Sequence, residues 1–135
     1  MKKVTIVAVL LMAMSLLAAC SSSSKDEGAS GQGWDLISAQ ELSDMMSSED
    51  VYLVNVHVPY EGEIPGTDAT ISYTEIASRV DELPTSGSPR LVIYCRSGNM
   101  SNQAAQDLIA AGVTGFSELE GGYTAWQAAG LPFTT

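Results

Sequence analysis

From about residue 34 onward, short runs rich in β-branched and aromatic residues alternate with stretches whose apolar residues recur at helical spacing. This alternation is typical of an α/β domain in which helices connect the strands of a largely parallel sheet. The pattern predicts strands at 34–37, 52–56, 69–71, 91–94 and 116–119. About 100 residues are enough for one such domain with one core.

Local signals predict where the helices begin and end. Ser38 with Glu41, and Ser72 with Glu75, have the spacing of a capping box, so each pair predicts a helix start. A third helix is expected to open at Ser101 and to close at Gly112, since glycine commonly follows the last helical turn. A short helix after a glycine pair ends the domain.

The first 19 residues have the pattern of a secretory signal, with Lys2 and Lys3 before an apolar run and small residues before Cys20. The run is shorter than the roughly 20 apolar residues of a membrane-spanning helix, so a permanent transmembrane anchor is the weaker alternative. We therefore expect a lipoprotein signal peptide at 1–19, a lipidated cysteine and flexible Ser/Gly linker at 20–33, and a folded domain at 34–135.

The LAAC segment ending at Cys20 resembles the lipobox of bacterial lipoproteins, which implies acylation of Cys20. Each buried methylene contributes about 0.8 kcal/mol, and more than one acyl chain gives stable attachment. The resemblance implies an extracytoplasmic protein anchored to a bacterial membrane by lipid. Ser21 follows the cysteine where aspartate would suggest retention at the inner membrane, which favours the periplasmic face of the outer membrane.

The charge balance excludes one class of partner. The chain has 16 acidic and 6 basic residues, and its formal net charge of −10 becomes −12 once Lys2 and Lys3 are removed. Such a chain repels phosphate backbones, so nucleic acid is not expected as a partner. Solubility is a sufficient explanation for the acidity.

Cysteine usage concentrates attention on one thiol. The chain has two cysteines and one histidine, and the lipobox interpretation uses Cys20. Cys95 then has no cysteine with which to form a disulfide, and a structural zinc site lacks ligands. Cys95 is therefore either an inert buried thiol or a reactive group, and we expect no metal and no cofactor.

The surroundings of Cys95 favour the reactive alternative. It directly follows the strand predicted at 91–94 and precedes a glycine-containing loop and a helix. Ligands of parallel α/β sheets bind beyond the carboxyl ends of strands, and a helix start offers free N–H groups to an anion. We expect these amides and Arg96 to favour the thiolate, and Gly98 to supply a positive φ.

The segments LVIYCRSGNMSNQAAQDLIAAG and LEGGYTAWQAAGLP resemble the active-site loop and C-terminal half of single-domain rhodaneses, and LVNVHVPYEGEIPGT is similar to an upstream part. The resemblance implies a three-layer fold with a five-stranded, mainly parallel sheet flanked by helices. It also implies transfer of sulfane sulfur from a small donor, through a persulfide on Cys95, to a thiol or cyanide. The substrate-binding residues that it implies are Arg96, Ser97, Gly98, Asn99, Met100 and Ser101.

The chain departs from the family pattern at several positions. Asn55 and His57 stand where aspartate and arginine are frequent, and Glu63 stands where histidine is frequent. Met100 replaces arginine or threonine, which is expected to weaken selection for a doubly charged donor. A persulfide or polysulfide donor then suits the site better than thiosulfate. Asn55 and His57 are expected to line the site, while a catalytic base at His57 is an alternative.

Other interpretations of the sequence remain open. Glu61 and Glu63 are either a carboxylate pair for acid–base chemistry or solvated loop residues, and Tyr123 and Trp126 are expected to pack in the core. The domain is either a sulfurtransferase or a catalytically weak binding or sulfur-sensing module. A phosphatase is disfavoured because Ser101 stands where those enzymes have the arginine that grips phosphate.

Overall fold

A parallel sheet forms the middle of the molecule in the computed structural model, which describes residues 32–135. Within these residues it has five strands, in the order β1-β5-β4-β2-β3, and every neighbouring pair is parallel. The strands are β1 (Asp35–Ile37), β2 (Val51–Asn55), β3 (Ala69–Thr70), β4 (Arg90–Tyr94) and β5 (Ser117–Leu119). The expected strands and the parallel sheet are confirmed, and no strand end differs by more than one residue from its predicted position. The predicted signal peptide, Cys20 and most of the predicted linker lie outside the described residues.

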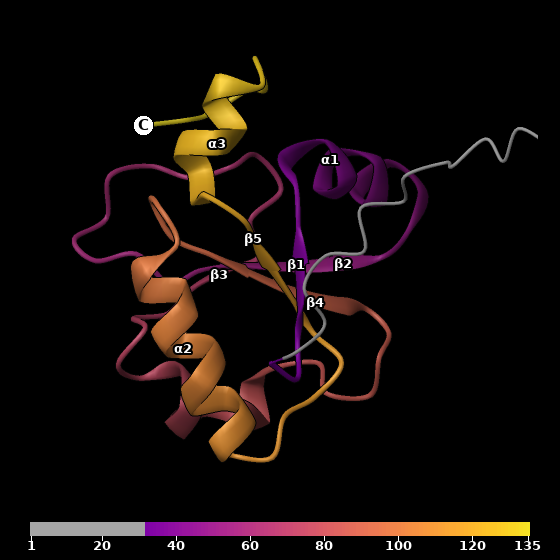
Figure 1. Cartoon of the computed structure of the whole chain (residues 1–135), viewed down its shortest axis with the longest axis vertical. Helices are drawn as coiled ribbons and strands as arrows, with labels where there is room; N and C mark the ends of the chain where they lie inside the picture. The colour runs from indigo at the N-terminus through magenta and orange to yellow at the C-terminus, as the bar shows by residue number, and fades with distance from the viewer. Residues whose placement is uncertain (1–31) are drawn as a thin grey trace, which may run out of the picture.

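Helices cover both faces of this sheet. Figure 1 shows α1 (Ala39–Ser48) and α3 (Gly122–Ala128) on one side and α2 (Asn99–Ala110) on the other. The 3-10 helix η1 (Ile76–Glu82) packs against α2. The three-layer α/β architecture is therefore confirmed.

Strand β4 divides its side chains between two apolar clusters. Val92 and Tyr94 belong to the cluster under α1 and α3, whereas Leu91 and Ile93 belong to the cluster under α2. Because successive side chains of a strand point to opposite faces, a strand covered on both sides reads as a continuous apolar run. This burial explains why LVIY is the clearest strand in the sequence, and it fixes the strand end from which Cys95 follows.

The two predicted capping boxes have different outcomes. Glu41 N–H donates to Ser38 Oγ over 3.2 Å, and Ser38 N–H donates to Glu41 Oε2 over 2.7 Å, so the first box is confirmed. The second is wrong, because Ser72 Oγ lies 2.9 Å from Thr74 Oγ1 and makes no capping box with Glu75. A 3-10 helix with a non-helical residue, Arg79, follows instead.

Helix α2 begins at Asn99, two residues before the predicted start at Ser101. Gly98, with a φ of 103°, is the residue before the first turn, and its carbonyl accepts the N–H of Asn102. A left-handed glycine turns the chain sharply enough to begin the helix early. At the other end, Gly112 has a φ of 88°, and its N–H donates a hydrogen bond to the carbonyl of Ile109. The helix therefore closes at Gly112, as the sequence predicts.

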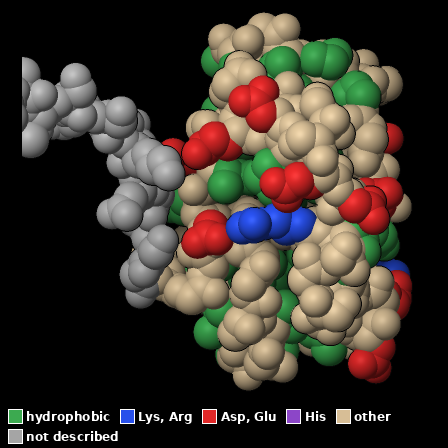
Figure 2. All heavy atoms as spheres, turned by 90° about the vertical axis from the view of Figure 1, so that its right-hand side faces the viewer, with side chains coloured by type: hydrophobic (Ala, Val, Ile, Leu, Met, Phe, Trp, Pro, Cys, Tyr) green, Lys and Arg blue, Asp and Glu red, His purple; other side chains and the backbone are tan. Residues whose placement is uncertain are grey.

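Acidic side chains are spread over the surface. On the face in Figure 2 they surround a small basic region. In the part of the chain that the structure describes, no helix has both the length and the apolar character needed to cross a bilayer.

Candidate functional site

Cys95 lies where β4 ends and the loop to α2 begins, as the sequence predicts. The backbone N–H of Gly98 donates a hydrogen bond to Cys95 Sγ over 3.1 Å. This bond requires the chain to curl back on itself, and the positive φ of Gly98 permits that curl without a Cβ clash. The sulfur therefore faces a main-chain hydrogen-bond donor, which favours negative charge on the sulfur.

Helix α3 holds the same loop from its other side. Its first backbone N–H groups, from Tyr123 and Thr124, donate to the carbonyl oxygens of Cys95 and Arg96 over 2.9 and 3.0 Å. Gly122 lies so close to these two carbonyls that a Cβ there would collide with both. The close approach fixes the loop backbone and hence the direction of the Cys95 side chain.

The thiol is nevertheless covered. Cys95 is 1% exposed, while Arg96, Ser97 and Asn99 in the same loop are exposed. Burial is the property expected of an inert thiol, and the hydrogen bond from Gly98 is the property expected of a reactive one. Burial alone therefore does not decide between the two.

The carboxylate of Glu61 gathers three side chains beside the loop. Its Oε2 accepts a hydrogen bond from Tyr123 Oη and lies 3.1 Å from His57 Nε2, and Arg96 Nη1 lies 3.3 Å from both carboxylate oxygens. The hydrogen bond from Tyr123 lowers the pKa of Glu61, and Arg96 and His57 act in the same direction against partial burial. Burial and the Glu61 carboxylate raise the pKa of Tyr123 to about 12. Glu61 is thus neither a free surface carboxylate nor half of an acid–base pair with Glu63.

The two predicted site-lining residues, Asn55 and His57, are buried. Asn55 donates from Nδ2 to the carbonyl of Gly62 and accepts the backbone N–H of His57, each over 3.0 Å. These bonds shape the loop that carries Glu61. The His57 ring lies edge-on to Tyr123, with ring centroids 5.7 Å apart. Asn55 therefore shapes the site wall, and His57 forms part of it.

The predicted substrate-binding residues divide into two groups. Arg96, with a side chain that is 56% exposed, remains reachable by a donor, and Ser97 and Asn99 are exposed beside it. Met100, in contrast, is half-buried and packs against the core cluster under α2. Ser101 is fully buried, and its Oγ lies 3.4 Å from Cys95 Sγ.

A buried carboxylate, Glu118, lies behind the loop and was not predicted as a site residue. Ser101 Oγ donates to Glu118 Oε1 over 2.6 Å, and Trp34 Nε1 donates to Glu118 Oε2 over 2.8 Å. Burial raises the pKa of Glu118, and hydrogen bonds from Ser101, Trp34 and Asn102 partly offset this effect. The one available signal was a charged residue inside the otherwise uncharged run FSEL.

The site thus combines a thiol, a main-chain hydrogen-bond donor, an exposed guanidinium and two carboxylates. Within residues 32–135, no three His, Cys, Asp or Glu side chains are grouped as metal ligands would be. The thiol lies at the carboxyl end of a parallel sheet, which is where ligands of such sheets bind.

The fold and the site define a class of three-layer α/β domains that carry a cysteine in the loop between a buried strand and a helix. The chain belongs to the rhodanese-like domain family, whose model matches residues 38–129. It is 37% identical over 100 residues to a protein named sulfurtransferase from Allochromatium vinosum, covering 71% of this chain and 91% of that one.

Two further similarities agree with this family. An uncharacterized protein from Synechocystis is 39% identical over 98 residues, which cover 71% of this chain and 54% of that protein. The chain thus spans about half the length of this relative. The crystal structure of a rhodanese-like domain protein from Staphylococcus aureus superposes with a TM-score of 0.59 and 26% identity, covering 74% of this chain and 98% of that one.

Proposed function

We propose that this protein is a sulfurtransferase that carries sulfane sulfur as a persulfide on Cys95. The Cys95 thiolate attacks the outer sulfur of a donor such as thiosulfate, a new S–S bond forms, and the donor's own S–S bond breaks, with its electron pair leaving on sulfite. A thiolate or cyanide then removes the outer sulfur from Cys95 and regenerates the thiolate. Other donors react in the same way with a different leaving group.

The observation that carries this proposal is the hydrogen bond from Gly98 N–H to Cys95 Sγ. A main-chain donor held in place before reaction stabilises negative charge on sulfur without reorganising. The exposed Arg96 side chain supplies a charge that can attract an anionic donor. The sulfurtransferase relative from Allochromatium vinosum supports the same chemistry.

Mass spectrometry tests this step directly. The full-length chain carrying Cys20→Ser, in which Cys95 is the single thiol, is exposed to thiosulfate or a polysulfide and its intact mass is measured. We expect a gain of one sulfur atom that cyanide removes, and no gain in the matched Cys95→Ala variant. Failure to gain that sulfur with every donor would falsify the proposal.

The second candidate is a module that binds or senses sulfur species with little turnover. The 1% exposure of Cys95 and the pairing of Arg96 with Glu61 favour it, because both hinder access of an anionic donor. Steady-state turnover that disappears in Cys95→Ala would exclude this candidate. Formation of the persulfide without turnover would support it.

We also propose that the protein works outside the cytoplasm, attached to a bacterial membrane through acylated Cys20, and that the donor and acceptor meet it there. The LAAC sequence ending at Cys20 supports this location. Metabolic labelling with palmitate should mark the wild-type chain and leave Cys20→Ser unlabelled. Equal labelling of the two would contradict the proposal.

A further inference from the structure

Glu118 is a buried carboxyl group for which the sulfur-transfer step above has no role. It is 2% exposed on β5, in the layer between the sheet and α2. An ionised carboxylate is costly to bury unless hydrogen bonds compensate, and here Trp34 and Ser101 donate to its two oxygens. Because Ser101 also contacts the sulfur, the carboxyl is connected to Cys95 through a single hydroxyl group.

The distances around Ser101 indicate where its hydroxyl hydrogen lies. Its Oγ is 2.6 Å from Glu118 Oε1, 3.2 Å from the carbonyl of Gly98 and 3.4 Å from Cys95 Sγ. A serine hydroxyl has one hydrogen to donate and lone pairs to accept others. With the hydrogen on the shortest contact, toward Glu118, a lone pair of Ser101 Oγ remains to accept the Cys95 S–H.

We propose that Ser101 and Glu118 take up the thiol proton of Cys95 in a two-proton shift, an inference that rests on the sulfurtransferase function above. The S–H bond breaks as its proton moves to Ser101 Oγ, and the former hydroxyl proton of Ser101 moves to Glu118 Oε1. No electron leaves the group and its net charge is unchanged. The negative charge passes from the Glu118 carboxylate to Cys95 Sγ, where Gly98 N–H stabilises it.

The surroundings support an internal proton acceptor. Cys95 is 1% exposed and Ser101 is fully buried, so the thiol proton has no direct contact with solvent. After the shift, Glu118 donates to Ser101 and Ser101 donates to the thiolate, so each group keeps a hydrogen-bond partner. Burial also raises the pKa of Glu118, which makes it a better proton acceptor than a surface carboxylate.

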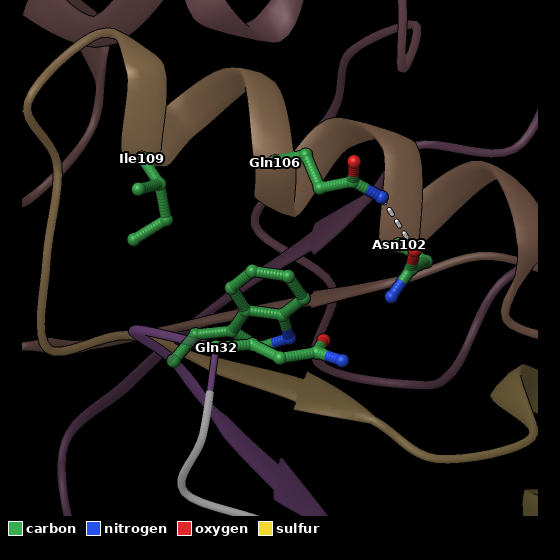
Figure 3. A pocket seen from close by; sticks show the side chains of 5 residues that line it. Gln32, Asn102, Gln106 and Ile109 are labelled. Atoms are coloured by element: carbon green, nitrogen blue, oxygen red, sulfur yellow. Dashed lines mark hydrogen bonds between the residues drawn. The ribbon is translucent and has the colours of Figure 1, made fainter.

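A pocket of about 430 Å³ lies on the far side of Trp34, and Glu118 itself does not line it. Trp34, which donates to Glu118, lines this pocket together with Asn102, and Figure 3 shows Asn102 on the helix above it with Gln106 and Ile109. The carboxyl is therefore shielded from solvent on this side as well, with an exposure of 2%.

Other charged groups near Cys95 must be separated from Glu118 in any test. Burial raises the pKa of Tyr123 to about 12, and the hydrogen bond from Tyr123 lowers the pKa of Glu61, so neither group changes charge near neutral pH. Histidine ordinarily changes charge near neutral pH, so a His57→Gln variant is measured beside the wild type.

The experiment is the pH dependence of Cys95 alkylation by iodoacetamide in the full-length chain carrying Cys20→Ser. When two groups share one proton, the thiolate fraction is independent of pH between their two ionisations, so we expect a plateau. Ser101→Ala and Glu118→Gln should lose the plateau and show a roughly tenfold change per pH unit below a single ionisation. Ser101→Thr, which retains a hydroxyl, should restore it.

Two outcomes would overturn the shared proton. One is a single ionisation in the wild type. The other is faster alkylation of Glu118→Gln than of the wild type at every pH, which would show that the carboxylate acts only as a repelling charge. Ser101→Ala gives an independent result if Glu118→Gln does not fold. Glu120→Gln, an exposed carboxyl two residues away, and His57→Gln should both keep the plateau.

The persulfide measurement separates this inference from the function on which it rests. A persulfide on Cys95 together with a single-ionisation profile would overturn the shared proton and leave the sulfurtransferase standing. Absence of the persulfide with every donor would overturn the function, whatever the alkylation profile.

Discussion

At the scale of single residues, Glu61 is the ion-pair partner of Arg96. Under the proposed function, this pairing affects how Arg96 binds an anionic sulfur donor. Arg96 is the exposed cation of the Cys95 loop, and in the structure its guanidinium faces the Glu61 carboxylate over 3.3 Å. A dianionic donor must compete with that carboxylate and also experiences its repulsion. For the proposed sulfur transfer, Glu61 is therefore a better physical reason than Met100 to expect weak selection of thiosulfate, because Met100 packs against the core cluster under α2.

Replacing this carboxylate should change donor preference. In Glu61→Gln the amide keeps a similar shape but no longer neutralises Arg96, so we expect KM for thiosulfate to fall roughly two- to fivefold, the range for an exposed ion pair. Steady-state kinetics with thiosulfate and with an uncharged persulfide donor measures the effect. The KM of the uncharged donor should not change.

The matched control for this prediction is Glu63→Gln, which removes the same charge from the same loop. No hydrogen bond joins Glu63 to Arg96 in the part of the chain that the structure describes. Equal effects of the two variants would mean that general charge, and not the contact with Arg96, decides donor preference.

At the scale of secondary-structure elements, the sequence predicted strands better than helix starts. The LVIY run identifies β4 because an uncharged, β-branched run marks a strand buried on both faces. The positive φ expected at Gly98 is present, but the start of α2 was missed by two residues, because the apolar helical spacing from which the start was predicted begins only after Ser101. The Ser72 capping box failed because Thr74 offered a nearer partner.

The part of the site that could be predicted is the part formed by residues close together in the sequence. Cys95 and Gly98 are neighbours in sequence, so the strand, loop and helix pattern places them together. Glu61, Tyr123 and Glu118 come from other segments, and only the packing of the fold brings their side chains to that loop. Local patterns carry no information on such long-range contacts.

The contact between α3 and the Cys95 loop gives a prediction at this scale. Gly122→Ala introduces a Cβ against the carbonyl oxygens of Cys95 and Arg96, and it also places a side chain at a φ of 59°. The unfavourable φ alone costs about 1–3 kcal/mol. We expect a larger loss of unfolding free energy in urea, together with a loss of sulfur transfer.

Gly130→Ala separates the two effects. Gly130 has a φ of 77°, and a Cβ there would have no heavy atom within 4 Å. It should therefore show the cost of positive φ without the collision, and sulfur transfer should be retained. Equal losses of activity in the two variants would contradict a specific role for the contact with α3.

At the scale of the whole molecule, Glu118 connects three parts of the fold. It lies on β5 and accepts hydrogen bonds from Ser101 of α2 and from Trp34, which immediately precedes β1. The apolar cluster under α2 packs around the same region. The stability of the folded chain should therefore depend on the protonation of this carboxyl.

The sign of that dependence follows from the direction of the pKa shift. A carboxyl whose pKa is raised on folding binds its proton more tightly in the folded state, so its contribution is complete below the unfolded pKa and is lost as the pH rises through the folded one. Glu118 should therefore make the chain more stable in mild acid than at neutral pH. At lower pH, Glu41, Glu61 and Glu82, whose pKa values are lowered on folding, lose their stabilising effect as they become protonated.

Urea denaturation at a series of pH values measures this dependence. We expect the midpoint of the wild type to rise as the pH falls from neutral toward the unfolded pKa of Glu118, and then to decline. Glu118→Gln should lack the rise, because the amide does not titrate, whereas Glu120→Gln should keep it. A rise that persists in Glu118→Gln would assign the effect to another group. The acidic surface would then be the first alternative, because protonation also relieves its net negative charge.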